Sequence, residues 1–160
     1  MNLKRKEKEM EKFKILLVDD EEEFVRTLAE RIQMRDLSSD VALNGEEALQ
    51  KVQEDLPDVI VLDLKMPGMH GMEVLRRIKE AYPEVQVVIL TGHGTEKHEQ
   101  MAKELGAFEY LEKPVDLDRL VSTLKLAYRK KIEDTMVAAT FAEAGDHKTA
   151  KEIMKSYKKK

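Results

Sequence analysis

The segment "VIVLDLKMPGMHG", residues 59–71, joins an apolar run to an aspartate and then to a loop rich in Pro, Gly and Met. Four consecutive aliphatic residues predict a short strand that is buried on both faces, as in a parallel sheet. Asp63 ends this run. A charged group beside a buried strand is costly unless something pairs with it, so Asp63 is either a solvated strand end or a residue with chemistry to perform.

Further short apolar runs occur on both sides of this segment. They are "KILLV" (14–18), "DVAL" (40–43), "VQVVIL" (85–90) and "AFEYL" (107–111). Apolar residues at helical spacing lie between and after the runs, over 21–36, 48–52, 74–78, 101–105 and 117–128. Strands that alternate with helices predict right-handed βαβ units. We therefore predict an α/β, doubly wound fold with five parallel strands. We take the strand order 2-1-3-4-5, which is one of the two common arrangements of such a sheet.

The two ends of the chain differ from the part between them. Residues 1–13 form a charged N-terminal segment, residues 14–129 a domain, and residues 130–160 a helical extension. The last predicted helix has no Gly or Pro to stop it at residue 129. The extension resembles two short helices around Gly145, with Asp146 as the N-cap of the second, so we predict a helical hairpin.

Composition limits the classes of function. The 160 residues are 42% hydrophobic and 38% charged and include no Cys, which excludes disulfides and thiolate metal sites and makes the cytoplasm the expected location. No apolar stretch approaches 18 residues, so we expect no membrane span. Residues 14–129 carry fifteen basic and twenty-four acidic side chains, a net charge of −9. A domain this acidic is not expected to bind nucleic acid.

Carboxylates follow two strands that the predicted order makes neighbours. Asp19 and Asp20 follow the first strand, and Asp63 follows the third. Three unpaired carboxylates at one sheet edge would repel each other, and Mg²⁺, which prefers oxygen ligands, removes the conflict. The alternative is that acidic residues merely begin a helix, whose N-terminus attracts negative charge. That alternative accounts better for the acidic residues at 21–23 than for the two aspartates.

Two more polar residues follow strands at the same edge. Thr91 follows the fourth strand, and Lys113 follows the fifth and precedes Pro114. Separately, a threonine there is often a turn residue and a lysine is usually solvated. Together with the aspartates they predict a polar crevice, and the Lys113–Pro114 peptide bond is a candidate for the cis form.

Residues 14–129 resemble a receiver domain of the two-component response regulator family. The resemblance rests on "ILLVDDEEEF", "NGEEAL", "PDVIVLDLKMPGMHGMEVL", "VVILTGHG" and "GAFEYLEKPVDLDRL", which together cover nearly the whole domain. The family has the flavodoxin-like sheet order predicted above. The resemblance implies a signalling module that accepts a phosphoryl group from a sensor histidine kinase or phosphotransfer protein.

The same resemblance implies a role for each site residue. Asp63 would be the phosphoacceptor, and Mg²⁺ would be held by Asp19, Asp20, Asp63 and the backbone carbonyl of Lys65. Thr91 and Lys113 would bind phosphoryl oxygens, Thr91 and Tyr110 would form the switch, and Lys65 and His93 would tune hydrolysis of the acyl phosphate. Residues 95–129 would change on phosphorylation and bind a downstream protein or a second receiver. The chain would not be an enzyme beyond its own phosphotransfer and slow autodephosphorylation.

Other interpretations remain open from the sequence. The chain could be a receiver fragment of a larger response regulator or hybrid kinase. A Mg²⁺-dependent phosphohydrolase of the haloacid-dehalogenase type would need a second Asp two residues after the nucleophile, where this chain has Lys65. A scaffold that works without phosphate is disfavoured by the intact set of polar residues. Residues 130–160 could cap the domain, form a dimer or dock on a partner.

Overall fold

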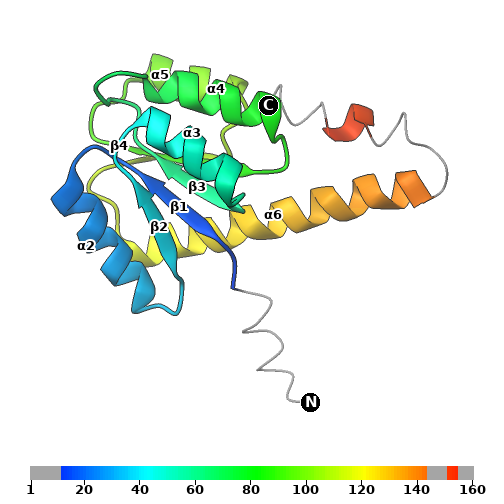
Figure 1. The fold of residues 1–160 in the computed structure, drawn as a ribbon, viewed down its shortest axis with the longest axis horizontal. Helices are drawn as coiled ribbons and strands as arrows, with labels where there is room; N and C mark the ends of the chain where they lie inside the picture. The colour runs from blue at the N-terminus through cyan, green and yellow to red at the C-terminus, as the bar shows by residue number, and fades with distance from the viewer. Residues whose placement is uncertain (1–11, 144–150, 155–160) are drawn as a thin grey trace.

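The computed structural model describes residues 12–143 and 151–154 and contains a five-stranded parallel sheet (Figure 1). The strands are β1 (Ile15–Val18), β2 (Ser39–Ala42), β3 (Val59–Leu62), β4 (Gln86–Thr91) and β5 (Glu109–Glu112). Their order is β2-β1-β3-β4-β5, and each adjacent pair is parallel. The predicted doubly wound fold and strand order are therefore confirmed.

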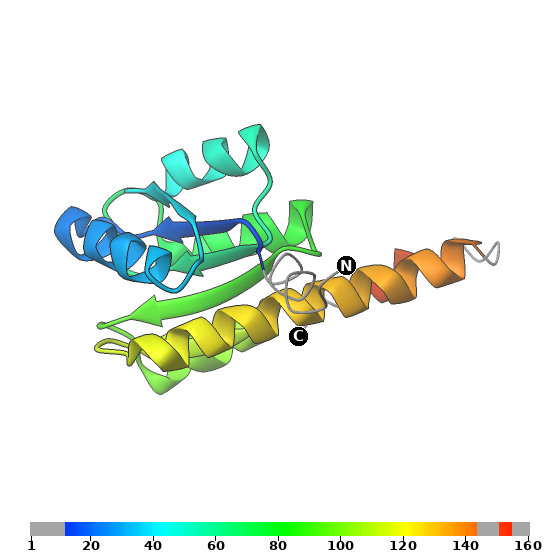
Figure 2. The same ribbon diagram turned by 90° about the horizontal axis from the view of Figure 1, so that it is seen from below.

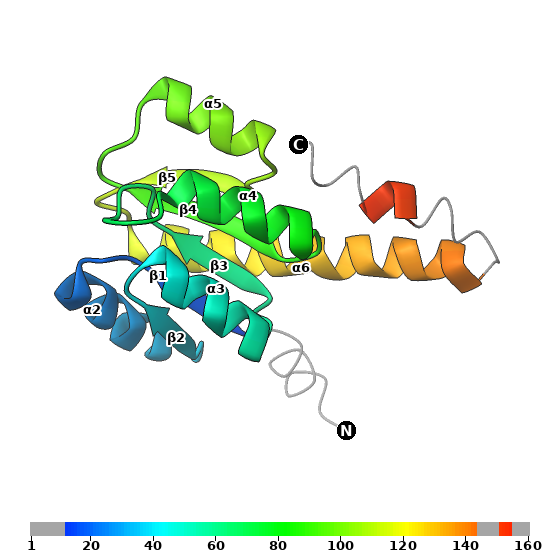
Figure 3. The ribbon, with the colours of Figure 1, turned by 45° about the horizontal axis from the view of Figure 1, so that its top comes forward.

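Helices cover both faces of the sheet. They are α2 (Glu22–Gln33), α3 (Gly45–Glu54), α4 (Gly71–Ala81), α5 (Glu96–Glu104) and α6 (Leu117–Glu143). Helices α3, α4 and α5 pack on one face, and α2 and α6 pack on the other (Figures 1 and 3). The two faces of the sheet are therefore covered, whereas the ends of its strands are not.

Strand β3 shows why the sequence run at residues 59–62 is apolar throughout. Ile60 and Leu62 belong to the core cluster under α3, α4 and α5, whereas Val59 and Val61 belong to the cluster under α2 and α6. Because successive side chains of a strand point to opposite faces, a strand covered on both faces needs apolar residues at every position. Helix α5 is covered less completely: Ala102 is buried, but Met101 is 40% exposed.

Helix α6 continues past residue 129, as the absence of Gly and Pro from this part of the sequence allowed. It runs without interruption across residue 129 to Glu143, and its C-terminal part extends beyond the sheet (Figure 2). Residues 151–154 are also helical. Gly145 and Asp146, on which the predicted hairpin depends, lie outside the described residues, so the hairpin stays a prediction. Among the described residues, no helix is long and apolar enough to cross a membrane.

Candidate functional site

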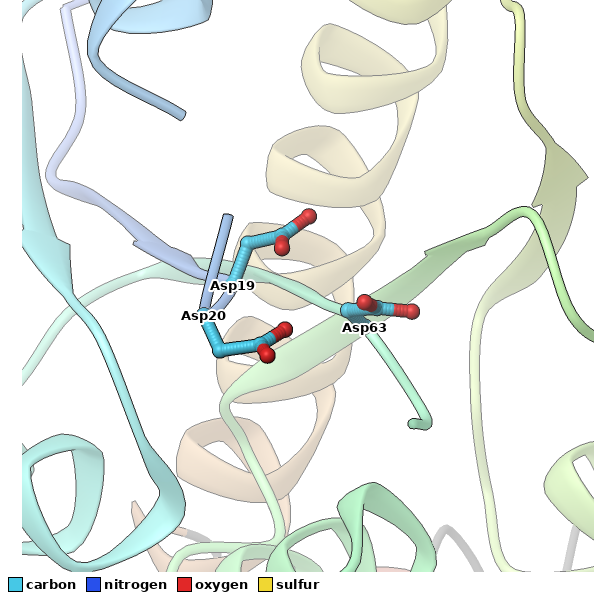
Figure 4. Close-up of side chains that lie close together, drawn as sticks. All are labelled: Asp19, Asp20 and Asp63. Atoms are coloured by element: carbon cyan, nitrogen blue, oxygen red, sulfur yellow. The ribbon is translucent and has the colours of Figure 1, made fainter. Parts of the chain in front are cut away.

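The carboxylates predicted to converge lie together at the carboxyl end of the sheet. Strands β1 and β3 pair in register, with Val18 opposite Leu62, so that the residues that follow them are neighbours. The backbone N–H of Asp63 donates a hydrogen bond to the carbonyl of Val18 at 3.0 Å. One carboxylate oxygen from each of Asp19, Asp20 and Asp63 lies within 4.8 Å of the other two (Figure 4).

Two of these carboxylates are taken out of water. Asp63 is 2% exposed and Asp19 is 4% exposed, whereas Asp20 is exposed. Burial raises the pKa of Asp19, and its hydrogen bonds with Lys113 and with the N–H of Glu21 oppose that shift. Within the described structure Asp63 Oδ1 is buried without a hydrogen-bond partner. A cluster of carboxylate oxygens with one oxygen still unpaired matches the ligand preference of Mg²⁺.

Lys113 supplies a positive charge to this cluster. Its Nζ lies 2.6 Å from Asp19 Oδ2, 3.4 Å from Glu21 Oε1 and 3.8 Å from Asp63 Oδ2. Burial acts to lower the pKa of Lys113, but these carboxylates raise it, and the net shift is upward. The Lys113–Pro114 peptide bond is cis. The lysine is therefore held charged, next to both buried aspartates.

Thr91 and Tyr110 lie beside each other, and both side chains border Gly94. Thr91 ends β4, is fully buried, and its carbonyl accepts a hydrogen bond from the N–H of Lys113 at 2.9 Å. Tyr110 in β5 is 6% exposed, and its hydroxyl has no hydrogen-bond partner among the described residues. Burial raises the pKa of the Tyr110 phenol. A Cβ atom added to Gly94 would lie 1.3 Å from Tyr110 Oη and 3.0 Å from Thr91 Cγ2. The tyrosine thus occupies the space that a side chain at residue 94 would fill.

The two residues predicted to tune the site lie in the loops around it. Lys65 is exposed in the loop after β3, two residues beyond Asp63. His93 is exposed after β4, and its N–H donates to Thr91 Oγ1 at 3.3 Å. The tuning role of both residues stays a prediction.

The structure also brings in residues that the sequence analysis did not assign to the site. Phe24 places its ring centroid 4.2 Å from Lys113 Nζ. Gly71 packs against the backbone that carries the phosphoacceptor candidate, since an added Cβ would lie 2.3 Å from the carbonyl oxygen of Asp63. The Gly71 N–H also donates to the Leu64 carbonyl at 2.9 Å. In the sequence, Gly71 is only a glycine at the start of a helix, and Phe24 is only an aromatic residue after an acidic run. Neither pattern is specific enough to predict a site residue.

The chain was compared with known protein families. The family model for the response regulator receiver domain matches residues 15–125, more than half of the chain. The chain belongs to this family. A match of this extent shows that it is a receiver domain with a phosphoacceptor signalling role, as the sequence resemblance predicted.

Individual relatives agree with this assignment. Sporulation initiation phosphotransferase F of Bacillus subtilis is 38% identical over 112 residues, which cover 70% of this chain and 90% of that protein. The alkaline phosphatase synthesis transcriptional regulatory protein PhoP of the same organism is 33% identical, and the match covers 73% of this chain but 49% of PhoP. The crystal structure of a response regulator receiver domain protein from Clostridium thermocellum superposes with a TM-score of 0.70 at 36% identity. The superposed part covers 74% of this chain and 95% of the Clostridium thermocellum chain.

Proposed function

We propose that Asp63 accepts a phosphoryl group from a phosphohistidine of a sensor histidine kinase or phosphotransfer protein. One observation carries the proposal: Asp63 is a buried carboxylate with one unpaired oxygen, placed beside an ammonium and two other carboxylates. A carboxylate oxygen of Asp63 attacks phosphorus, the phosphorus–nitrogen bond breaks, and the electron pair of that bond returns to the imidazole. The product is an aspartyl phosphate.

The residues around Asp63 fit a bound Mg²⁺. Asp19, Asp20 and Asp63 would hold the ion together with the backbone carbonyl of Lys65, and the bound ion supplies neutralising charge to the phosphoryl oxygens. Phosphoryl transfer depends on positioning and charge neutralisation more than on covalent catalysis by the protein. Lys113 neutralises a further charge, since it already lies 3.8 Å from Asp63 Oδ2.

Thr91 and Tyr110 form the proposed switch. The Thr91 hydroxyl binds a phosphoryl oxygen, and the position of Tyr110 follows that of Thr91, because both side chains border Gly94. Their movement changes the surface of residues 95–129, which then binds a downstream protein or a second copy of the chain. Light scattering with and without a phosphoryl mimic would detect a dimer formed through this surface or through the C-terminal helices.

The proposal also covers the lifetime of the aspartyl phosphate and the role of the chain in the cell. Lys65 and His93 control the access of water to the aspartyl phosphate, which the half-lives of Lys65→Ala and His93→Ala would report. The chain acts as a signalling module of the cytoplasm and catalyses only its own phosphotransfer and slow loss of the phosphoryl group. Its net acidic domain disfavours direct binding to nucleic acid, although the relative PhoP is named a transcriptional regulatory protein.

A test of the phosphoacceptor uses a small donor with a phosphorus–nitrogen bond. Wild-type protein, incubated with phosphoramidate and Mg²⁺, should gain the mass of one phosphoryl group, and this gain should require Mg²⁺. Asp63→Asn should show no gain, because an amide cannot act as the nucleophile. Asp40→Asn is the matched control, since it makes the same change at an exposed residue of β2 and should behave as wild type. Phosphorylation of Asp63→Asn to the wild-type extent would overturn the proposal.

A further inference from the structure

Lys113 lies between an interior and an exterior set of partners. Inside the crevice are Asp19 and Asp63, which are buried. Outside is Glu21, whose side chain is 56% exposed and whose Oε1 lies 3.4 Å from Lys113 Nζ. A lysine side chain has many rotamers, so an ammonium with acidic partners on both sides would divide its time between them unless something restricts it.

The ring of Phe24 is placed to restrict the rotamers of Lys113. Its centroid lies 4.2 Å from Lys113 Nζ, well within the distance at which the face of an aromatic ring attracts a cation. Phe24 belongs to the first turn of α2 and packs against the core cluster under α2 and α6. With Asp19 and Asp63 it also lines a cavity of only about 10 Å³, so that little space remains behind the aspartates. Phe24 is half-buried and the Lys113 side chain is 13% exposed, so the attraction acts in a partly desolvated environment, where it is stronger than at a fully exposed site.

We propose that Phe24 is a positioning residue for phosphoryl transfer, whose ring face holds the Lys113 ammonium beside Asp19 and Asp63. This inference rests on the proposed function of Asp63. A lysine that is already in place does not lose its rotamer freedom when the phosphoryl group arrives, and that preorganisation favours the phosphorylated state. Phe24 touches neither the donor nor the phosphoryl group and acts only through Lys113.

The test measures the affinity of a phosphoryl mimic, beryllium fluoride with Mg²⁺, by calorimetry. Phe24→Leu keeps an apolar side chain but removes the ring face, and it should weaken binding about five-fold. Phe24→Tyr restores the ring and should bind as wild type does. Phe13→Leu is the matched control, because Phe13 belongs to the same core cluster but precedes β1 at the other end of the sheet, where it stacks on Tyr128. It should leave the affinity unchanged.

A double-mutant cycle separates positioning from packing. In a Lys113→Met background, Phe24→Leu should have no further effect on binding of the mimic, because no ammonium remains to be positioned. Glu21→Gln should recover part of the affinity lost in Phe24→Leu, since it weakens the exterior partner. Equal losses with and without Lys113, or a Phe24→Tyr variant as weak as Phe24→Leu, would overturn the inference. Failure of the wild-type protein to bind the mimic would instead overturn the proposed function.

Discussion

Residue 94 is glycine, and Tyr110 occupies the space that a side chain there would fill. A Cβ atom there would lie 1.3 Å from Tyr110 Oη and 2.6 Å from Cζ, so the inward tyrosine requires glycine at this position. The inward position leaves the Tyr110 hydroxyl buried without a hydrogen-bond partner among the described residues. An unpaired buried hydroxyl costs free energy, and in the proposed switch this cost opposes the inward position.

Replacement of Gly94 should move the tyrosine outward. In Gly94→Ala the methyl group and the Tyr110 ring cannot occupy the same space, so the ring should leave its site. The pKa of Tyr110, now raised by burial, should then fall toward the ordinary value for tyrosine. Ultraviolet titration of the phenols, with Tyr110→Phe to assign the signal, would measure this change.

Gly92→Ala is the control for this experiment. A Cβ atom at residue 92 would make only ordinary contacts, at 3.8 Å from the Lys113 side chain. The pKa of Tyr110 should therefore stay raised in Gly92→Ala. If it also stayed raised in Gly94→Ala, residue 94 would not control the position of the ring.

At the scale of elements, α6 is joined to the opposite end of the sheet from the proposed phosphoacceptor site. The Tyr128 ring stacks on Phe13 with the ring centroids 4.5 Å apart. One turn further along, Lys131 forms an ion pair and hydrogen bond with Asp58, which precedes β3 and also accepts from the backbone N–H of Lys14 at 2.8 Å. The helix beyond residue 128 is thus tied to the starts of β1 and β3.

Loss of the Lys131 ion pair should weaken this attachment. Both side chains are about one-fifth exposed, so Lys131→Met should lower the free energy of unfolding by about 1 kcal/mol, more than an exposed pair would give. Urea denaturation would measure the change. Lys97→Met, the same substitution at an exposed residue of α5, should change stability much less. Equal values for the two variants would show that the pair contributes nothing to the attachment of α6.

At the scale of the whole molecule, backbone topology was predictable and side-chain rotamers were not. Apolar runs alternating with helices predicted a doubly wound parallel sheet, for which 2-1-3-4-5 is one of two common strand orders, and that order places Asp19 and Asp63 after adjacent strands. The contact of Phe24 with Lys113 depends on the direction of α2 relative to β5, which no local pattern encodes. The length of α6 depends on contacts such as that of Tyr128 with Phe13, and the sequence shows only that no Gly or Pro interrupts it.

Lys79 illustrates the same limit and has a consequence for the stability of the whole domain. A lysine in a helical pattern is expected to be solvated, but Lys79 follows Leu75 by one turn and is 2% exposed. Its Nζ donates to the carbonyls of Pro83 and Val85 at 2.8 and 2.9 Å. Burial lowers the pKa of Lys79 from 10.5 to about 8, against the opposing effect of Glu84 and Asp134.

This shift predicts a rise of stability with pH. Between pH 8 and 10.5 the unfolded chain keeps the proton on Lys79 while the folded chain loses it, so the free energy of unfolding should increase across this window. The contribution is present above pH 10.5 and is lost as the pH falls through 8. Its upper limit is roughly 3 to 4 kcal/mol, because the pKa falls by about 2.5 units and each unit corresponds to about 1.4 kcal/mol.

Comparison with a variant isolates this contribution from the other lysines and tyrosines that titrate in the same range. Urea denaturation of wild type and Lys79→Met from pH 7 to 10.5 should give a difference in unfolding free energy that moves in favour of wild type as the pH rises. Methionine fills similar volume but cannot titrate. Lys97→Met, the same substitution at an exposed residue, is the control. A constant difference for Lys79→Met would mean that Lys79 keeps its proton in the folded domain across this range.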